Sequence, residues 1–137
     1  MVSGAGEGGR MAYQYRMPGK RPKYNNQKHE YGGHKFDSNK ELARYKTLKQ
    51  WQELGIISEL RLQQTFVLTE KGKRDPDGKA IIPVKYIADF VYVDNETGKT
   101  IVEDVKGYRN AANGAYRIFK IKQKLMFDRF GIWVREV

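Results

Sequence analysis

Two stretches in the second half of the chain alternate apolar and polar residues and predict neighbouring strands. Residues 80–93 and 100–106 are rich in β-branched and aromatic side chains. Side chains on a strand alternate between its two faces, so Val102, Asp104 and Lys106 should share one face. The intervening residues should then lie on the opposite face.

Apolar residues at helical spacing predict two helices, over residues 38–54 and 115–130. Ser38 fits the N-cap of the first helix and Glu41 its third position, which together form a capping box. Gly131 fits the end of the second helix. This helix is expected to turn six apolar side chains to the core: Ile118, Phe119, Ile121, Leu125, Met126 and Phe130.

Further strands are predicted over residues 56–68 and 132–137, with a small hairpin over 28–36 around two consecutive glycines. Loops between the three central strands are short, which favours antiparallel pairing. The expected fold is α/β, more specifically α+β with a mixed sheet. The order of its core elements is α-β-β-β-α-β.

The first 27 residues differ from the rest of the chain and predict a flexible, basic arm. They begin with a Gly-rich stretch, after which basic residues alternate with Tyr13, Tyr15 and Tyr24. Such alternation suits phosphate contact combined with base stacking, and a disordered solubilising arm is the alternative. Residues 28–137 are expected to form a single domain.

The net charge of +10 favours nucleic acid or an anionic membrane as partner. No apolar run approaches the ~20 residues of a membrane span, and a signal-peptide core is not seen. The sequence therefore predicts a cytoplasmic protein that binds nucleic acid and not membrane. With no cysteine, disulfides and thiolate metal sites are excluded.

The charge is unevenly spread. Residues 1–35 carry a net +5, residues 36–105 a net −1 and residues 106–137 a net +6. Acids in the middle segment suit metal binding, and basic flanks suit phosphate binding. The alternative is an ordinary solvated surface with a basic tail.

Carboxylates in the predicted strands are the candidate chemistry. Asp89 lies inside an apolar strand, where an acid costs free energy unless it is paired. A divalent metal held between Asp89 and Asp104 would supply that pairing. Glu41 could be a further ligand of this metal, although its role in the capping box would by itself account for a glutamate at this position. Gln64 is either a polar neighbour or a sheet-edge amide, and a bulge would bring Glu103 to the face of Asp104.

An acid on the first helix, an acid on the second strand and acid-x-Lys on the third resemble the PD-(D/E)XK nuclease superfamily. Asp104-Val105-Lys106 matches the acid-x-Lys motif. Asp89 matches the upstream acid, with Ala88 in place of the namesake proline. Glu41 matches the helical acid of the branch that contains archaeal-type Holliday junction resolvases.

Three longer motifs look more closely like a family of small, mostly phage-encoded proteins assigned to that superfamily as nucleases or junction resolvases. They are Phe36-Asp37-Ser38-x-x-Glu41, Tyr86-Ile87-Ala88-Asp89-Phe90 and Val102-Glu103-Asp104-Val105-Lys106-Gly107. The resemblance covers residues 24–137. It implies a restriction-endonuclease-like core and a metal-dependent endodeoxyribonuclease selective for DNA structure, acting in phage recombination in the host cytoplasm.

The resemblance also implies roles for individual residues. Asp89 and Asp104, helped by the Val105 carbonyl, would hold Mg²⁺, for which Mn²⁺ could substitute. Glu41 would ligate directly or through water, or complete a second metal site. Lys106 would orient the attacking water or stabilise the pentavalent transition state. The residues expected to contact DNA are Lys20, Arg21, Lys23, Lys28, Tyr108, Arg109, Lys120, Lys122 and Lys124.

The expected partner is branched DNA, with no small-molecule cofactor. A four-way junction has approximate two-fold symmetry, so two symmetric nicks call for two active sites and hence a homodimer. Two alternatives remain: a non-catalytic nucleic-acid-binding protein that kept the fold, or a nuclease subunit that is active only within a larger complex.

Overall fold

The computed structural model describes residues 29–107, 109–110 and 112–137. The chain divides into two compact units, residues 1–38 and 39–137. In the first, β1 (His29–Tyr31) pairs antiparallel with β2 (His34–Phe36). Gly32 and Gly33 join them with φ of 61° and 82°, the positive values that a two-residue hairpin turn requires. The predicted hairpin is confirmed, whereas the predicted arm over residues 1–27 lies outside the described residues.

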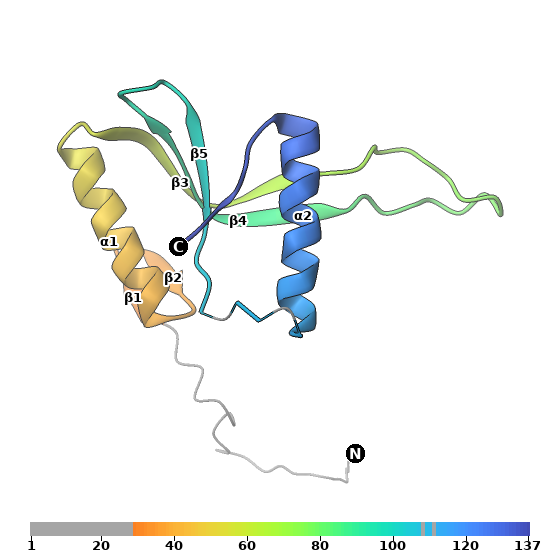
Figure 1. Ribbon diagram of the computed structural model, residues 1–137, viewed down its shortest axis with the longest axis horizontal. Coiled ribbons are helices and arrows are strands. Elements are labelled where there is room, and N and C mark those ends of the chain that lie inside the picture. Colours follow the sequence, from red (N-terminus) through yellow and green to blue (C-terminus); the bar gives the residue numbers. More distant parts are fainter. Residues whose placement is uncertain (1–28, 108, 111) are drawn as a thin grey trace, which may run out of the picture. The chain divides into compact units, whose positions relative to one another are not determined.

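The second unit contains two helices and a four-stranded mixed sheet (Figure 1). The strand order is β3-β4-β5-β6, in which the first three strands are antiparallel neighbours and β6 runs parallel to β5. The predicted mixed α/β class is confirmed. The elements are α1 (Asn39–Glu53), β3 (Ile57–Val67), β4 (Lys85–Asp94), β5 (Thr100–Asp104), α2 (Gly114–Phe130) and β6 (Arg135–Glu136).

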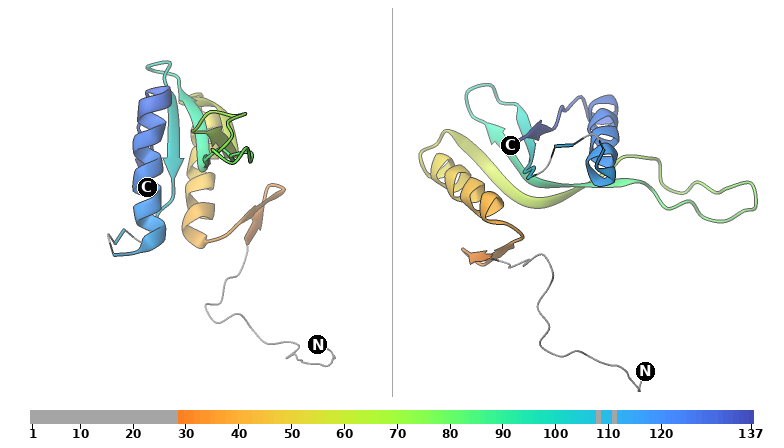
Figure 2. Two further views of the ribbon diagram at one scale, coloured as in Figure 1. Left: turned by 90° about the vertical axis from the view of Figure 1, so that its right-hand side faces the viewer. Right: turned by 60° about the horizontal axis from the view of Figure 1, so that its bottom comes forward.

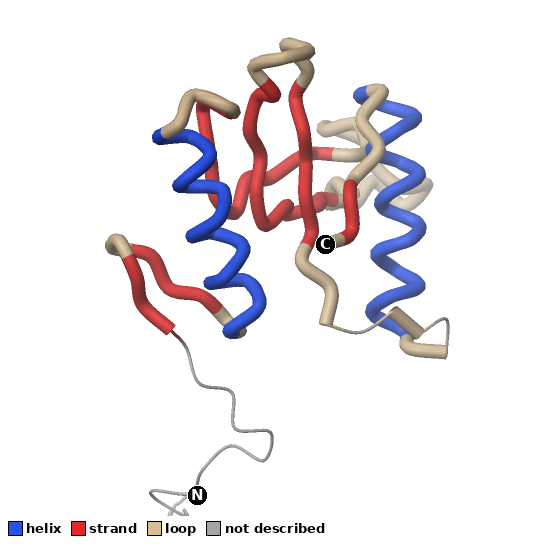
Figure 3. The backbone as a smooth tube through the Cα atoms, turned by 60° about the vertical axis from the view of Figure 1, so that its left-hand side comes forward, coloured by secondary structure: helices blue, strands red, loops and turns tan. Residues whose placement is uncertain are grey.

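The two helices cover opposite faces of the sheet (Figure 3). On the α1 face, Tyr45 stacks on Phe90 of β4 with ring centroids 6.4 Å apart. On the α2 face, Phe119 and Met126 are buried in one cluster with Val102 of β5. Among the described residues, neither helix is long and apolar enough to cross a membrane. With both faces covered, functional groups can reach the surface where the strands of the sheet end or separate.

The apolar face of α2 is narrower than predicted. Its buried residues are Phe119, Gln123 and Met126, whereas Ile118 and Ile121 are 55% and 58% exposed. The prediction that these two isoleucines face the core is therefore wrong. The buried residues form one row spaced by three and four positions, with Leu125 packed partly buried beside it, and a polar residue occupies the middle of that row. Gln123 is tolerated there because its amide donates a hydrogen bond to the Val134 carbonyl, at 2.8 Å.

The connection between β3 and β4 extends beyond the sheet as a long hairpin arm (Figure 2). β4 begins at Lys85 and not at residue 80 as predicted, because Pro83 has no N–H to donate to a strand ladder. At the base of the arm, the Leu68 N–H donates to the Val84 carbonyl at 2.8 Å. The last strand is also shorter than predicted, with residues 135–136 in place of 132–137.

Candidate active site

The candidate site lies where β4 and β5 separate. Their ladder pairs Phe90 with Glu103, and the next residues in the same register are Asp89 and Asp104. The Val105 backbone N–H, just past the end of β5, donates a hydrogen bond to Asp89 Oδ2 at 2.7 Å. The two acids that the sequence singles out therefore face each other at the open end of the ladder.

The environment of Asp89 disfavours a free negative charge. The pKa of the Asp89 carboxyl is raised to about 6, mainly by burial and in addition by the nearby Asp104 carboxylate. Hydrogen bonds from the Val105 amide and the Gln63 side chain act in the opposite direction. Positive charge between the two carboxylates would relieve this repulsion.

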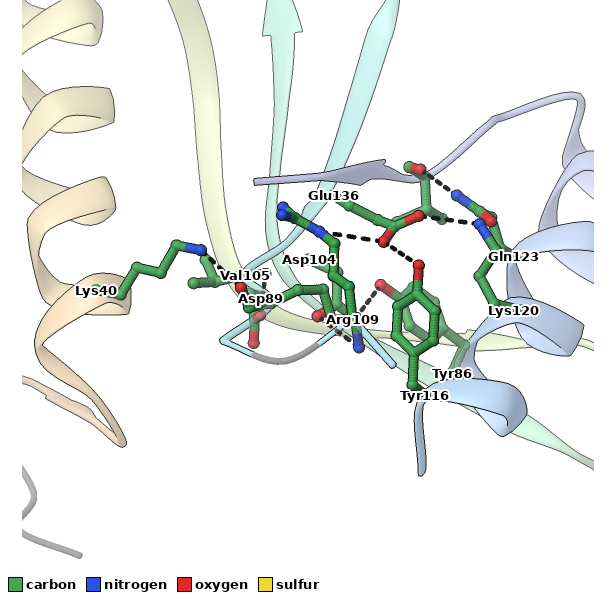
Figure 4. A network of polar contacts seen from close by, with 12 residues as sticks. Lys40, Tyr86, Asp89, Asp104, Val105, Arg109, Tyr116, Lys120, Gln123 and Glu136 are labelled. Atoms are coloured by element: carbon green, nitrogen blue, oxygen red, sulfur yellow. Dashed lines mark hydrogen bonds and ion pairs between the residues drawn. The ribbon is translucent and has the colours of Figure 1, made fainter. Parts of the chain in front are cut away.

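Asp104 is held by two neighbours on its own side of the sheet, of which Figure 4 labels Tyr86. The Tyr86 hydroxyl donates to Asp104 Oδ2 at 2.7 Å, and Lys106 Nζ lies 3.2 Å from Oδ1. Burial raises the pKa of the Tyr86 hydroxyl above its ordinary value, so the hydroxyl remains a proton donor. The Lys106 ammonium also lies 3.7 Å from the centroid of the Phe119 ring, a cation–π contact. The predicted sharing of one face by Asp104 and Lys106 is confirmed.

Glu41 of α1 joins the site through a residue that the sequence did not indicate. Gln63 Nε2 donates to both Glu41 Oε2 and Asp89 Oδ1, each at 3.2 Å. Gln63 has a φ of 52°, in the left-handed region that non-glycine residues rarely adopt and that often marks functional sites. The alternation pattern favoured Gln64 instead, which lies on the half-buried face of β3 with its Oε1 buried and unpaired.

Glu103 lies on the opposite face from Asp104, and no bulge brings it to the site. Arg44 of α1 donates from Nε to Glu103 Oε1 at 2.8 Å and from Nη2 to Oε2 at 2.6 Å. The Tyr92 hydroxyl also donates to Oε2. The Glu103 side chain is fully buried, so this bidentate pair joins α1 to the sheet.

Two residues predicted to contact DNA, Arg109 and Lys120, converge on an acid (Figure 4), and their contact with DNA stays a prediction. Arg109 Nε lies 3.4 Å from Glu136 Oε1, and Lys120 Nζ lies 3.0 Å from Oε2. Tyr116 also donates to Glu136, at 2.7 Å. Lys122 is half-buried and Lys124 is exposed on the same helix. The remaining predicted contacts lie outside the described residues: Lys20, Arg21, Lys23, Lys28 and Tyr108.

A family model described as "Protein of unknown function (DUF1064)" matches residues 21–134. The chain belongs to the DUF1064 family. No curated protein and no solved structure matches it. The matched part of this DUF1064 chain includes all residues of the candidate site: Glu41, Gln63, Asp89, Asp104 and Lys106.

The donor set fits a divalent cation held by two carboxylates. Asp89 and Asp104 offer oxygen ligands side by side, which suits a hard cation such as Mg²⁺. Across the described part of the chain, no group of three or more Asp, Glu, His or Cys side chains is placed to hold one metal. The Gln63 amide lies between Glu41 and Asp89. Direct ligation by Glu41, like that by the Val105 carbonyl, therefore stays a prediction.

Proposed function

We propose that this chain is a metal-dependent endodeoxyribonuclease that hydrolyses phosphodiester bonds in branched DNA. The observation that carries the proposal is the meeting of Asp89 and Asp104 at the end of the β4–β5 ladder, with Lys106 3.2 Å from Asp104. The resemblance of these residues and of Glu41 to the PD-(D/E)XK nucleases supports the same assignment.

Phosphodiester hydrolysis requires an activated water and positive charge near the phosphate. Asp89 and Asp104 would hold Mg²⁺, or Mn²⁺ in its place, which when bound would supply that charge and activate water for attack. Lys106 keeps its ammonium beside Asp104, where it can donate to a phosphate oxygen as negative charge develops. Tyr86 holds the Asp104 carboxylate in a fixed orientation through its hydroxyl.

The proposal extends to a homodimer that resolves four-way junctions in DNA recombination, in the host cytoplasm if the protein is encoded by a phage. Each chain offers one candidate site, and a two-fold junction presents two equivalent strands to cut. Phe130 and Trp133 are 42% and 51% exposed, which supports a further interface on this chain.

The proposal is tested with purified protein, Mg²⁺ and four DNA substrates: a four-way junction, a flap, a single strand and a linear duplex. We expect cleavage of branched DNA by the wild type and none by Asp89→Asn or Asp104→Asn. Both variants should still bind DNA, with equal or higher affinity, because each removes a negative charge that faces the phosphate. Asp128→Asn removes an exposed acid of α2 and is the matched control, which should cut as the wild type does.

Cleavage at the wild-type rate by either aspartate variant would show that the assigned site is wrong. Binding without cleavage by the wild type, with Mg²⁺ and with Mn²⁺, would exclude an enzyme that acts alone. A strict monomer that cuts linear duplex as fast as junctions would contradict the resolvase part of the proposal and leave a general nuclease.

A further inference from the structure

A groove of about 310 Å³ opens beside the candidate site, between β4 and the N-terminal half of α2. Asp104 is among its lining residues, and four residues of α2 between positions 115 and 122 line it as well. Because it shares Asp104 and Lys106 with the candidate site, a molecule bound in the groove would reach the reacting groups directly. The residues that matter here are Lys85, Tyr86, Asp104, Lys106, Ile118 and Lys122.

The lining combines positive charge with apolar surface. Three lysines and a single acid line the groove, so it favours an anion. Ile118 belongs to the same lining and is 55% exposed, although Phe119 beside it fills the core. An exposed isoleucine between lysines has no role in packing the sheet. The combination matches a nucleotide strand, which is charged at its phosphates and apolar on the faces of its bases.

We propose that this groove holds an unpaired stretch of the DNA strand that is cleaved. Lys85 and Lys122 would contact phosphates on either side of the scissile one, and Ile118 would pack against an unstacked base. The inference rests on the proposed function, because it places the scissile phosphate at Asp104 and Lys106. Base faces are accessible only when bases leave the stack, and unstacking is easiest where the strand is already unpaired. Branch points and flaps supply such nucleotides, whereas intact duplex does not.

The apolar contact is tested by Ile118→Asn, with Ile121→Asn as the matched control. Both isoleucines are exposed to nearly the same degree, 55% and 58%, and Ile121 does not line the groove. Binding is measured by fluorescence anisotropy in EDTA, with a fluorescein-labelled flap and a blunt duplex of the same sequence. The wild type should prefer the flap. Ile118→Asn should weaken flap binding about tenfold, the range of one lost base contact, and leave duplex binding unchanged.

The phosphate contact is tested by Lys122→Gln, with Lys124→Gln as the control from the exposed side of the same helix. Each phosphate neutralised on a single strand contributes a slope of about −0.7 in log K against log salt. Lys122→Gln should therefore make the slope for the flap shallower by about 0.7, and Lys124→Gln should leave it unchanged.

Equal losses in Ile118→Asn and Ile121→Asn, or equal slopes in the two lysine variants, would overturn the groove assignment. Wild-type binding that does not distinguish flap from duplex would overturn it too. The EDTA measurements do not depend on cleavage, so the two proposals can fail separately. Flap binding through Ile118 without cleavage in Mg²⁺ contradicts the nuclease alone, whereas cleavage that depends on Asp104 with normal flap binding by Ile118→Asn contradicts the groove alone.

Discussion

Replacing Arg44 with methionine tests whether the buried pair with Glu103 stabilises the fold. The change removes two hydrogen bonds to a carboxylate that is completely buried and leaves it with a hydrogen bond from the Tyr92 hydroxyl. Methionine keeps an apolar side chain of similar length and loses the guanidinium, which also lies 5.0 Å from the centroid of the Trp51 ring. The loss is therefore mainly that of the charge partner.

Removing one partner of a buried ion pair typically costs about 3–5 kcal/mol. The Arg44 side chain is 25% exposed, so water can reach part of the site and the lower end applies, about 3 kcal/mol. For a chain of this size, that loss lowers Tm by on the order of 10 °C. Urea unfolding followed by tryptophan fluorescence measures the free energy of unfolding directly.

Two further variants make the interpretation specific. Arg117→Met removes an exposed arginine of α2 and should change the free energy of unfolding by less than about 0.5 kcal/mol. Adding Glu103→Gln to Arg44→Met removes the buried negative charge that has lost its partner. The free energy of unfolding should then recover by at least about 1 kcal/mol. If Arg44→Met loses less than about 1 kcal/mol, or the double variant is less stable than the single one, the buried-charge argument fails.

Four other predictions follow from the site and the sequence. Glu41→Gln should lower cleavage by orders of magnitude at unchanged Tm, because glutamine still suits the third position of a helix but is a poor ligand for Mg²⁺; an active variant would leave Glu41 a structural role. Tyr86→Phe should lower kcat/KM and, by urea unfolding, cost about 1.5–3 kcal/mol, because Asp104 loses a donor; wild-type values for both would show that this hydrogen bond does no positioning. Deleting residues 1–23, which carry five Lys/Arg, should make the salt slope of duplex binding shallower by roughly 2.7 if three phosphate contacts are lost; an unchanged slope would mean that the segment does not touch DNA. Sedimentation should give a mass near twice 15.9 kDa, and a monomer mass at all concentrations would refute the dimer.

Much of the fold could be predicted from the sequence because it depends on local geometry. The hairpin at Gly32 and Gly33 needs only two residues that tolerate positive φ. The placement of Asp104 and Glu103 on opposite faces of β5 follows from the two-residue period of a strand. Asp104 indeed meets Tyr86 and Lys106, whereas Glu103 meets Arg44.

Other features depend on which elements meet, which a local pattern does not contain. The hydrophobic pattern of α2 allowed a broad apolar face, but the sheet covers only the row through Phe119 and Met126 and leaves Ile118 at the groove. The charge of Lys120 is visible in the sequence. Its pairing with Glu136, sixteen residues away, is decided only when β6 packs beside α2.

The sequence by itself determined the pair of strand acids, the lysine beside them and the mixed α/β class. The tertiary structure alone decided that Gln63, and not Gln64, reaches Glu41 and Asp89, residues 22 and 26 positions away along the chain. Strict alternation places Gln63 on the exposed side of β3. The left-handed backbone at this residue departs from the extended geometry on which alternation depends, and its side-chain partners, Asp89 of β4 and Glu41 of α1, are both distant in the sequence.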